Sequence, residues 1–238
     1  MKAVKCIFYG DSGTGKTVLL GSASEVKECN PVLLIDLERG SMSIASKCRE
    51  ITFSELGKPI PGKIDHIKVF KWPELEAIID YLYKESNPYK TILLDSLTET
   101  NYLNLTTVTK TAGRPDAAQI QDYGRSAAQM RKTVREFRNY DDINVFISCL
   151  ANEEKDESTG IMKVKPALTG KLVGEIPALV DIVGYLTIDK DGETRIMYFQ
   201  PSNRYVAKDR TEKGVIGRSI INPTIADIFA KVKNVKES

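Results

Sequence analysis

One glycine-rich segment near the amino end constrains what this chain can fold into more than any other feature of the sequence. Its residues are Gly10, Asp11, Ser12, Gly13, Thr14, Gly15, Lys16 and Thr17. They match the pattern G-x-x-x-x-G-K-[ST] in full, after a β-rich run at 2–9 and before a helical pattern at 15–24. A strand, a glycine-rich loop and a helix in this order wrap backbone N–H groups around a phosphate chain. The sequence therefore predicts a phosphate-binding loop, or P-loop.

The residue types of this loop indicate what it binds. Glycines let the backbone approach a phosphate closely. Lys16 supplies a positive charge for the β- and γ-phosphates, and the Thr17 hydroxyl is placed to bind Mg²⁺. We therefore expect the eight loop residues and Val18 to bind ATP, with Mg²⁺ as the accompanying ion.

Acidic residues at the ends of apolar runs are the candidates for metal binding and catalysis. Asp95 ends the run TILLD and is expected to hold Mg²⁺ together with Thr17. A carboxylate is also needed to orient and deprotonate the attacking water. Glu38, which follows the run PVLLID, and Glu99, four residues past Asp95, are both candidates, while Asp36 could instead be structural.

Apolar runs alternate with helical patterns along most of the chain, which predicts an α/β fold with a mainly parallel sheet flanked by helices. The predicted strands are residues 2–9, 31–36, 66–70, 91–95 and 143–150, and the predicted helices include 15–24, 73–86 and 125–138. The pair DIVGYLTI and TRIMYFQ flanks KDGE at 190–193, which predicts an antiparallel hairpin near the carboxyl end. A last helix is expected at about 223–233, and residues 1–238 are expected to form a single domain.

Two polar segments, 109–117 and 152–170, are predicted as exposed loops. The second is longer than a compact domain normally tolerates without a functional reason.

Composition excludes several other classes of protein. The longest apolar runs fall far short of the roughly 20 residues of a membrane span, and no secretory signal opens the chain. The four cysteines are scattered without a C-x-x-C pair, and the single histidine, His66, excludes a multi-histidine metal site. These features favour a protein with reduced thiols in the cytoplasm. The net charge of +2 does not by itself indicate a nucleic-acid partner.

Taken in order, GDSGTGKT, LLIDLERG and TILLDS resemble the RecA/Rad51 core of recombination ATPases. The segments VFISCL and ALTGKLVGEIPALVDIVGYL resemble that family's sensor strand and the helix and strand after its second DNA-binding loop. The resemblance covers most of residues 2–210 and implies a RecA-like P-loop NTPase fold. It also implies that Glu38 is the catalytic glutamate beside Lys16. With its first strand at residues 2–9, we expect no amino-terminal polymerisation domain.

Such a minimal core is most similar to the phage-encoded single-strand-annealing ATPases, which implies several partners. Single-stranded DNA, further copies of the chain in a ring or filament, and a single-strand-binding protein are expected, in the host cytoplasm and with no membrane. The sensor strand departs from the family pattern, because Ser148, Cys149 and Leu150 are not strong γ-phosphate ligands. Either Ser148 or Asn152 takes that role, or the coupling between hydrolysis and the loop is weakened.

The resemblance also implies positions for basic residues. The first DNA-binding loop would be 106–117, and the second would lie within 152–170. Their candidate contacts are Lys110, Arg114, Lys155, Lys163, Lys165 and, just beyond, Lys171. Three further residues, Arg204, Lys208 and Arg210, are candidates to reach the γ-phosphate of a neighbouring protomer. Plain solvation explains charged loops equally simply, and neither loop contains an aromatic residue for base stacking.

Two other functions remain open at this stage. A P-loop small-molecule kinase would share the first motif, although no separate arginine-rich lid is evident. A nucleotide-gated DNA-binding protein with little hydrolysis would fit the unusual sensor strand.

Overall fold

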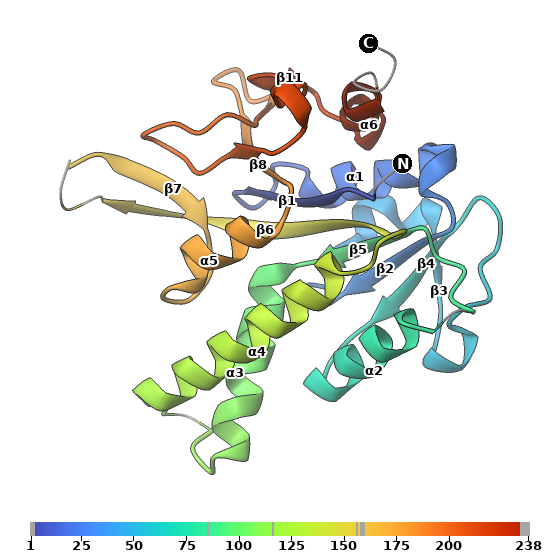
Figure 1. The fold of residues 1–238 in the computed structure, drawn as a ribbon, viewed down its shortest axis with the longest axis vertical. Helices are drawn as coiled ribbons and strands as arrows, with labels where there is room; N and C mark the ends of the chain where they lie inside the picture. The colour runs from blue at the N-terminus through green and yellow to red at the C-terminus, as the bar shows by residue number, and fades with distance from the viewer. Residues whose placement is uncertain (1–2, 85, 116, 156, 158–159, 234–238) are drawn as a thin grey trace.

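A mixed β-sheet runs through the middle of the protein, with helices packed against it (Figure 1). The computed structural model describes residues 3–84, 86–115, 117–155, 157 and 160–233. Within these residues the strands are β1 (Lys5–Gly10), β2 (Val32–Asp36), β3 (Cys48–Glu50), β4 (Ile64–Lys68), β5 (Thr91–Asp95), β6 (Asn144–Lys155), β7 (Met162–Pro166), β8 (Ile182–Ile188), β9 (Arg195–Tyr198), β10 (Lys208–Asp209) and β11 (Ser219–Ile221). The α-helices are α1 (Lys16–Gly21), α2 (Trp72–Leu82), α3 (Leu97–Thr111), α4 (Ile120–Arg138), α5 (Leu172–Leu179) and α6 (Ile225–Lys233).

The strand order across the sheet is β11-β9-β8-β1-β6-β5-β2-β4-β3, with β10 paired to β8 and β7 paired to β6. From β8 to β3 in this order the strands are parallel, whereas β7, β9, β10 and β11 are antiparallel to their partners. The predicted mainly parallel α/β sheet with antiparallel strands near the carboxyl end is therefore confirmed.

The register of the parallel strands brings their carboxyl ends to one edge of the sheet. Gly10, the last residue of β1, pairs with Leu150 of β6. Asp36, the last residue of β2, pairs with Asp95, the last residue of β5. The loops that follow these strands therefore meet at the same edge, which is where open α/β sheets bind ligands.

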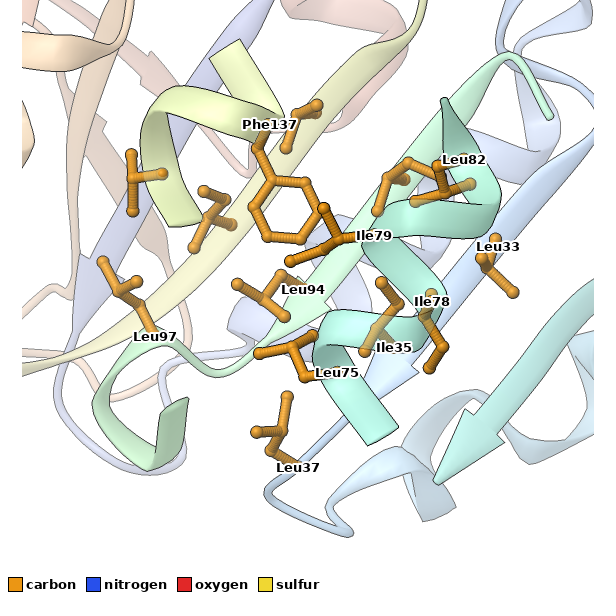
Figure 2. Close-up of a cluster of buried hydrophobic side chains, with 14 of the residues drawn as sticks. Leu33, Ile35, Leu37, Leu75, Ile78, Ile79, Leu82, Leu94, Leu97 and Phe137 are labelled. Carbon is orange, nitrogen blue, oxygen red and sulfur yellow. The ribbon is translucent and has the colours of Figure 1, made fainter. Parts of the chain in front are cut away.

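Two apolar layers hold the sheet in place because successive strand residues point to opposite faces. Ile7 and Tyr9 of β1 belong to the core shared with α2, α4 and α5, whereas Cys6 and Phe8 belong to the core shared with α1 and α6. Figure 2 shows the first of these cores where α2 packs on β2 and β5. Its labelled side chains from these elements are Leu75, Ile78, Ile79, Leu82, Leu33, Ile35 and Leu94.

The segment 152–170, predicted as a long exposed loop, forms a β-hairpin instead. β6 continues to Lys155, and β7 returns antiparallel to it, with Asn152 opposite Lys165. The hairpin extends away from the body of the protein (Figure 1). Residues 152–155 of β6 are all polar, so this end of the strand lacks the alternation of apolar and polar residues that marks a half-buried strand. β7 does alternate, with Met162, Val164 and Pro166 on one face and lysines on the other, but over only five residues. Residues 156, 158 and 159 of this segment lie outside the described residues.

The predicted loop 106–117 is also partly wrong. Helix α3 continues to Thr111, so the first half of this segment is helical and Lys110 lies in its last turn. Four threonines between 106 and 111 hide the helix from a sequence reading, because threonine favours helices weakly. Asp116 lies outside the described residues.

The remaining predicted elements agree with the structure apart from small shifts. The strand expected at 66–70 is β4, the hairpin around KDGE is β8 and β9, and the last helix is α6. Among the described helices, none has the length and apolar character needed to cross a bilayer.

Candidate functional site

The P-loop joins the end of β1 to the start of α1 through a backbone that only glycine adopts easily. Gly13 and Gly15 have φ angles of 80° and 94°, in the left-handed region where a side chain causes strain. Thr14 closes the turn, since its hydroxyl donates to the carbonyl oxygen of Asp11 at 2.9 Å. Asp11, Ser12 and Gly13 are exposed, so this side of the loop is open to a ligand.

Lys16 folds back over the loop. Its Nζ donates to the carbonyl oxygens of Gly10 at 2.9 Å and Asp11 at 2.8 Å. Burial lowers the pKa of Lys16, while the charges of Glu38 and Asp95 act in the opposite direction. A buried ammonium group held over an open ring of backbone atoms fits a phosphate chain, because phosphate oxygens can bond to the amine as these two carbonyls do here.

Asp95 and Thr17 are brought together beneath the loop. The Thr17 hydroxyl donates to Oδ2 of Asp95 at 2.8 Å, and the Ser148 hydroxyl from β6 donates to Oδ1. Burial raises the pKa of Asp95, and the hydrogen bonds from Ser148 and Thr17 partly offset that rise. A hydroxyl and a carboxylate in contact at the edge of a phosphate site are the donor set expected for Mg²⁺ in P-loop proteins.

Glu38 lies beside this pair because the chain after β2 is anchored to β5. The backbone N–H groups of Leu37 and Glu38 both donate to the carbonyl oxygen of Asp95, at 2.7 and 3.1 Å. Desolvation and the nearby Asp95 charge raise the pKa of Glu38, while Ser96 and Lys16 oppose that rise. A carboxylate with a raised pKa is well suited to accept a proton near neutral pH.

The alternative base, Glu99, lies in the first turn of α3, where its backbone N–H donates to the Ser96 hydroxyl at 3.3 Å. Glu38 lines the cavity above the P-loop together with Lys16 and Thr17, whereas Glu99 is not among the residues that line it. The geometry therefore favours Glu38.

Asp36 has a structural environment. Its Oδ2 bonds to Nε2 of His66 at 2.8 Å, and its Oδ1 accepts the backbone N–H of Arg39 at 2.6 Å. Burial alone would raise the pKa of Asp36, but these hydrogen bonds bring it below the ordinary value. Asp36 and His66 thus stabilise the turn that carries Glu38.

Along β6, the side chains of Ser148, Cys149 and Asn152 lie in different surroundings. Ser148 is bonded to Asp95, as described above. Cys149 is buried beside the Thr98 hydroxyl at 3.3 Å, and burial raises the pKa of its thiol to about 11. Asn152 lies on the exposed hairpin and donates to Glu154 at 3.1 Å. Of these side chains, Ser148 is the one in contact with the predicted metal ligands.

The cavity above the P-loop has a volume of about 400 Å³ and includes a residue that the sequence did not suggest. Arg195, the first residue of β9, lines it, and its Nε donates to the carbonyl oxygen of Thr14 at 3.1 Å. The two residues are 181 positions apart, so only the pairing of β9 with β8 brings them together. The Asp-Gly hairpin was the one signal that pointed toward this edge.

The three predicted trans residues lie away from this cavity. Lys208 is in β10, which pairs with the first residues of β8 at the opposite edge of the sheet. Its Nζ donates to the carbonyl oxygens of Pro177 and Ala178, and burial together with Arg210 lowers its pKa to about 8. Arg210 is exposed and follows β10, and Arg204 is exposed near the hairpin formed by β6 and β7.

The six predicted DNA contacts fall into two groups. Lys155, Lys163 and Lys165 lie on the β6–β7 hairpin, where Lys165 pairs with Glu154 at 3.1 Å. The others lie elsewhere: Lys110 in the last turn of α3, Arg114 paired with the buried Asp122 at 2.7 Å, and Lys171 at the start of α5. The ion pair of Arg114 with Asp122 therefore stabilises the start of α4, which gives Arg114 a structural role that does not need DNA.

A stack of tyrosines lies at the base of the β6–β7 hairpin. The rings of Tyr185, Tyr198 and Tyr205 are stacked on one another with centroids 5.1 to 6.5 Å apart. Tyr185 and Tyr205, together with Arg204, line a cavity of about 380 Å³ that also contacts Met162 of β7. This cluster could not be recognised from the sequence, because its members lie in separate segments, outside the two predicted loops.

The P-loop between β1 and α1, the buried Asp95 on a neighbouring parallel strand and the helix-flanked sheet define a P-loop nucleoside triphosphatase. A family model described as an AAA domain matches residues 2–211, and the chain belongs to this family. AAA domains are P-loop proteins, so the family assignment indicates nucleotide binding and hydrolysis. No curated protein was found to match the chain.

Proposed function

We propose that this protein is a RecA-like ATPase that hydrolyses Mg·ATP and acts on single-stranded DNA in phage-type recombination or annealing. The observation that carries the ATPase part is the contact between Thr17 and Asp95 beneath the P-loop, with Glu38 anchored beside it. ATP hydrolysis needs a phosphate site, a metal site and a general base close together, and the P-loop, the Thr17–Asp95 pair and Glu38 fit these three needs.

The residues of the site divide the work of hydrolysis. The loop amides and Lys16 bind and orient the β- and γ-phosphates, and Thr17 and Asp95 would hold Mg²⁺, which offsets phosphate charge when bound. Glu38 accepts a proton from the attacking water. The water oxygen then bonds to the γ-phosphorus as the bond to the bridging oxygen breaks, giving ADP and inorganic phosphate.

Two features of the β6–β7 hairpin support the DNA part of the proposal. Lys155, Lys163 and Lys165 provide positive charges along an exposed structure, which suits contacts to a phosphate backbone without sequence preference. The cavity beside Tyr205 and Arg204 offers an aromatic surface and a cation, a combination that binds unpaired bases. The aromatic partner that the two predicted loops lack is thus supplied by a third segment.

Assembly of several copies is part of the same proposal. If Arg204, Lys208 or Arg210 reaches a neighbour's γ-phosphate, hydrolysis depends on contacts between protomers, and an isolated protomer has negligible turnover. The ATPase rate per protomer is then expected to fall on dilution. A rate that stays constant down to the monomer contradicts the trans contacts. A single-strand-binding protein is a further proposed partner, since both would meet on the same strand.

The decisive experiment measures ATP hydrolysis with and without single-stranded DNA at several salt concentrations. We expect stimulation that weakens as salt rises, because lysine contacts to phosphates release counterions. Replacing Lys155, Lys163 and Lys165 by alanine should remove the stimulation. The matched control replaces Lys27, Lys90 and Lys132, which are exposed elsewhere. A rate indifferent to DNA at low salt removes the recombination role and leaves the ATPase proposal standing.

Two outcomes would instead support the other functions. Transfer of phosphate to a nucleoside in place of phosphate release indicates a kinase. In an ATPase, Glu38→Gln should abolish ATP turnover and keep nucleotide affinity. In a nucleotide-gated binding protein, the wild type already has negligible turnover, so the substitution changes nothing measurable in the rate.

A further inference from the structure

Arg195 is held against the P-loop from the carboxyl-terminal part of the chain. Besides the bond from its Nε to the Thr14 carbonyl oxygen, its side chain covers the next residue of the loop. A Cβ atom placed on Gly15 would lie 2.8 Å from this Nε. Gly15 therefore leaves room for the close approach of Arg195, while its φ angle of 94° is what favours glycine at this position.

The backbone of Arg195 is fixed by a reciprocal pair of hydrogen bonds with Asn222, which follows β11. The N–H of Arg195 donates to Oδ1 of Asn222 at 3.0 Å, and the N–H of Asn222 donates to the carbonyl oxygen of Arg195 at 2.7 Å. Asn222 has a φ of 46°, a conformation that asparagine tolerates better than most residues. These two hydrogen bonds fix the backbone position from which the exposed Arg195 side chain reaches the P-loop.

The guanidinium group of Arg195 has N–H donors beyond the one that bonds to Thr14. Within the described residues, Nε is the guanidinium atom that takes part in a hydrogen bond, and the side chain lines the cavity shared with Lys16 and Glu38. The planar guanidinium can bind a phosphate through two donors or lie flat on a base.

The strand order decides which part of a nucleotide would meet Arg195. On one side of β1 lie β6, β5 and β2, whose ends carry the groups for metal and water, Asp95 and Glu38. On the other side lie β8 and β9, which bring Arg195. A triphosphate whose γ-phosphate points toward Asp95 and Glu38 has its other end on the side of Arg195.

We propose that Arg195 is a binding residue, supplied by the same chain, for the nucleoside end of the nucleotide, that is, for its sugar and base. This proposal rests on the proposed nucleotide site and adds to it a determinant of nucleoside recognition. It assigns Arg195 to affinity and not to the chemical step.

The test compares how Arg195→Ala and the wild type bind ADP and inorganic tripolyphosphate, both with Mg²⁺, by isothermal titration calorimetry. ADP carries a nucleoside, whereas tripolyphosphate carries none. We expect ADP affinity to fall about 10- to 100-fold, as for loss of hydrogen bonds to a charged group, and tripolyphosphate affinity to change less than about threefold. In ATP hydrolysis KM should rise with kcat nearly unchanged.

Two further variants make the test specific. Arg195→Lys keeps the charge and removes the planar fork, so we expect most of the loss of ADP affinity to remain. Arg218→Ala, at an exposed arginine before β11, is the matched control and should behave as the wild type. Equal thermal midpoints for the variants show that folding is intact.

The outcomes separate this proposal from the function on which it rests. Equal losses for ADP and tripolyphosphate, or a fall in kcat with ADP affinity unchanged, overturn the assignment to the nucleoside end. If Arg195→Ala binds ADP as Arg218→Ala does while the wild type hydrolyses ATP, this inference fails and the ATPase stands. A wild type that binds neither ligand overturns both.

Discussion

The P-loop lies between two flanks of the sheet that are built differently. On the flank of β6, β5 and β2, the predicted metal ligand is fixed through its side chain: Asp95 is buried and accepts hydrogen bonds from Thr17 and Ser148. The exposed Glu38 is anchored to the same residue through its backbone N–H. On the flank of β8 and β9, Arg195 is exposed and is fixed mainly through its backbone, by Asn222.

This difference matches what each flank is proposed to do. A group that holds a metal needs a position set to a fraction of an ångström, and the buried hydrogen bonds of Asp95 provide it. A group that supplies affinity tolerates a looser placement. We therefore expect substitutions on the first flank to lower turnover and substitutions on the second to lower affinity.

Lys16 lies at the P-loop, between the two flanks, and we expect its replacement to have the largest effect on ATP hydrolysis. Lys16→Ala removes the buried ammonium from Gly10 and Asp11 and from the phosphates, so we expect kcat/KM for ATP to fall about 1000-fold and ADP affinity to fall as well. Lys190→Ala, in the turn between β8 and β9, is the control. If Lys16→Ala keeps a tenth of the wild-type kcat/KM, the proposed role of the P-loop in binding the phosphates of ATP is contradicted.

Asp95→Asn tests the first flank alone. It preserves the shape of the side chain but removes the charge that would hold Mg²⁺, so we expect kcat to fall roughly 100-fold. Binding of ADP in the presence of a chelator should stay within about twofold of the wild type, because the nucleoside end is on the other flank. Asp80→Asn, on the exposed face of α2, is the control. A large loss of metal-free ADP binding would remove the distinction between the flanks.

The pH dependence sharpens the same comparison. Because the pKa of Glu38 is raised, its base form is lost as the pH falls, and this loss begins at a higher pH than for an ordinary glutamate near about 4.3. Below that pKa we expect kcat/KM to fall about tenfold per pH unit. ADP binding measured with a chelator should show no such limb, because Glu38 is proposed to act in the chemical step and not in binding. Steady-state rates and binding measured across the acid range check both expectations.

His66→Ala should give the smallest of these effects, one on stability. The variant leaves the buried Asp36 carboxylate without its partner at 2.8 Å, and we expect the free energy of unfolding to fall by about 2 kcal/mol. Asp36 has a lowered pKa, so its stabilising contribution is present above the ordinary value and is lost as the pH falls through the lowered one. Asn222→Ala, on the other flank, should cost about 1 kcal/mol or less. Chemical denaturation of both variants measures the difference, and equal losses would contradict it.

The first flank could be predicted from sequence because its residues lie at strand ends. Asp95 is the last residue of β5, and Glu38 follows β2 by two residues. Parallel strands bring such positions together whatever the rest of the chain does, so the apolar runs were enough to locate them. The structure places Thr17, Asp95 and Glu38 as this reasoning expects, and their chemical roles stay predictions.

The second flank could not be predicted in this way. Arg195 meets Thr14 only through antiparallel pairing of β9 with β8, and the tyrosine stack is assembled from β8, β9 and the segment at Tyr205. Nothing local distinguishes these residues from other surface arginines and tyrosines. The β6–β7 hairpin has a related explanation, since residues 152–155 of β6 are all polar and the alternation in β7 lasts only five residues.

The length of β6 has a mechanical consequence. The strand runs without interruption from Asn144, deep between β1 and β5, to Lys155 on the projecting hairpin, passing Ser148 on the way. No turn interrupts this strand, and the hairpin is also held through β7, where Val164 shares backbone hydrogen bonds with Arg204 and Val206. We therefore expect a displacement of the projecting hairpin to be transmitted along β6 to Ser148 and its contact with Asp95.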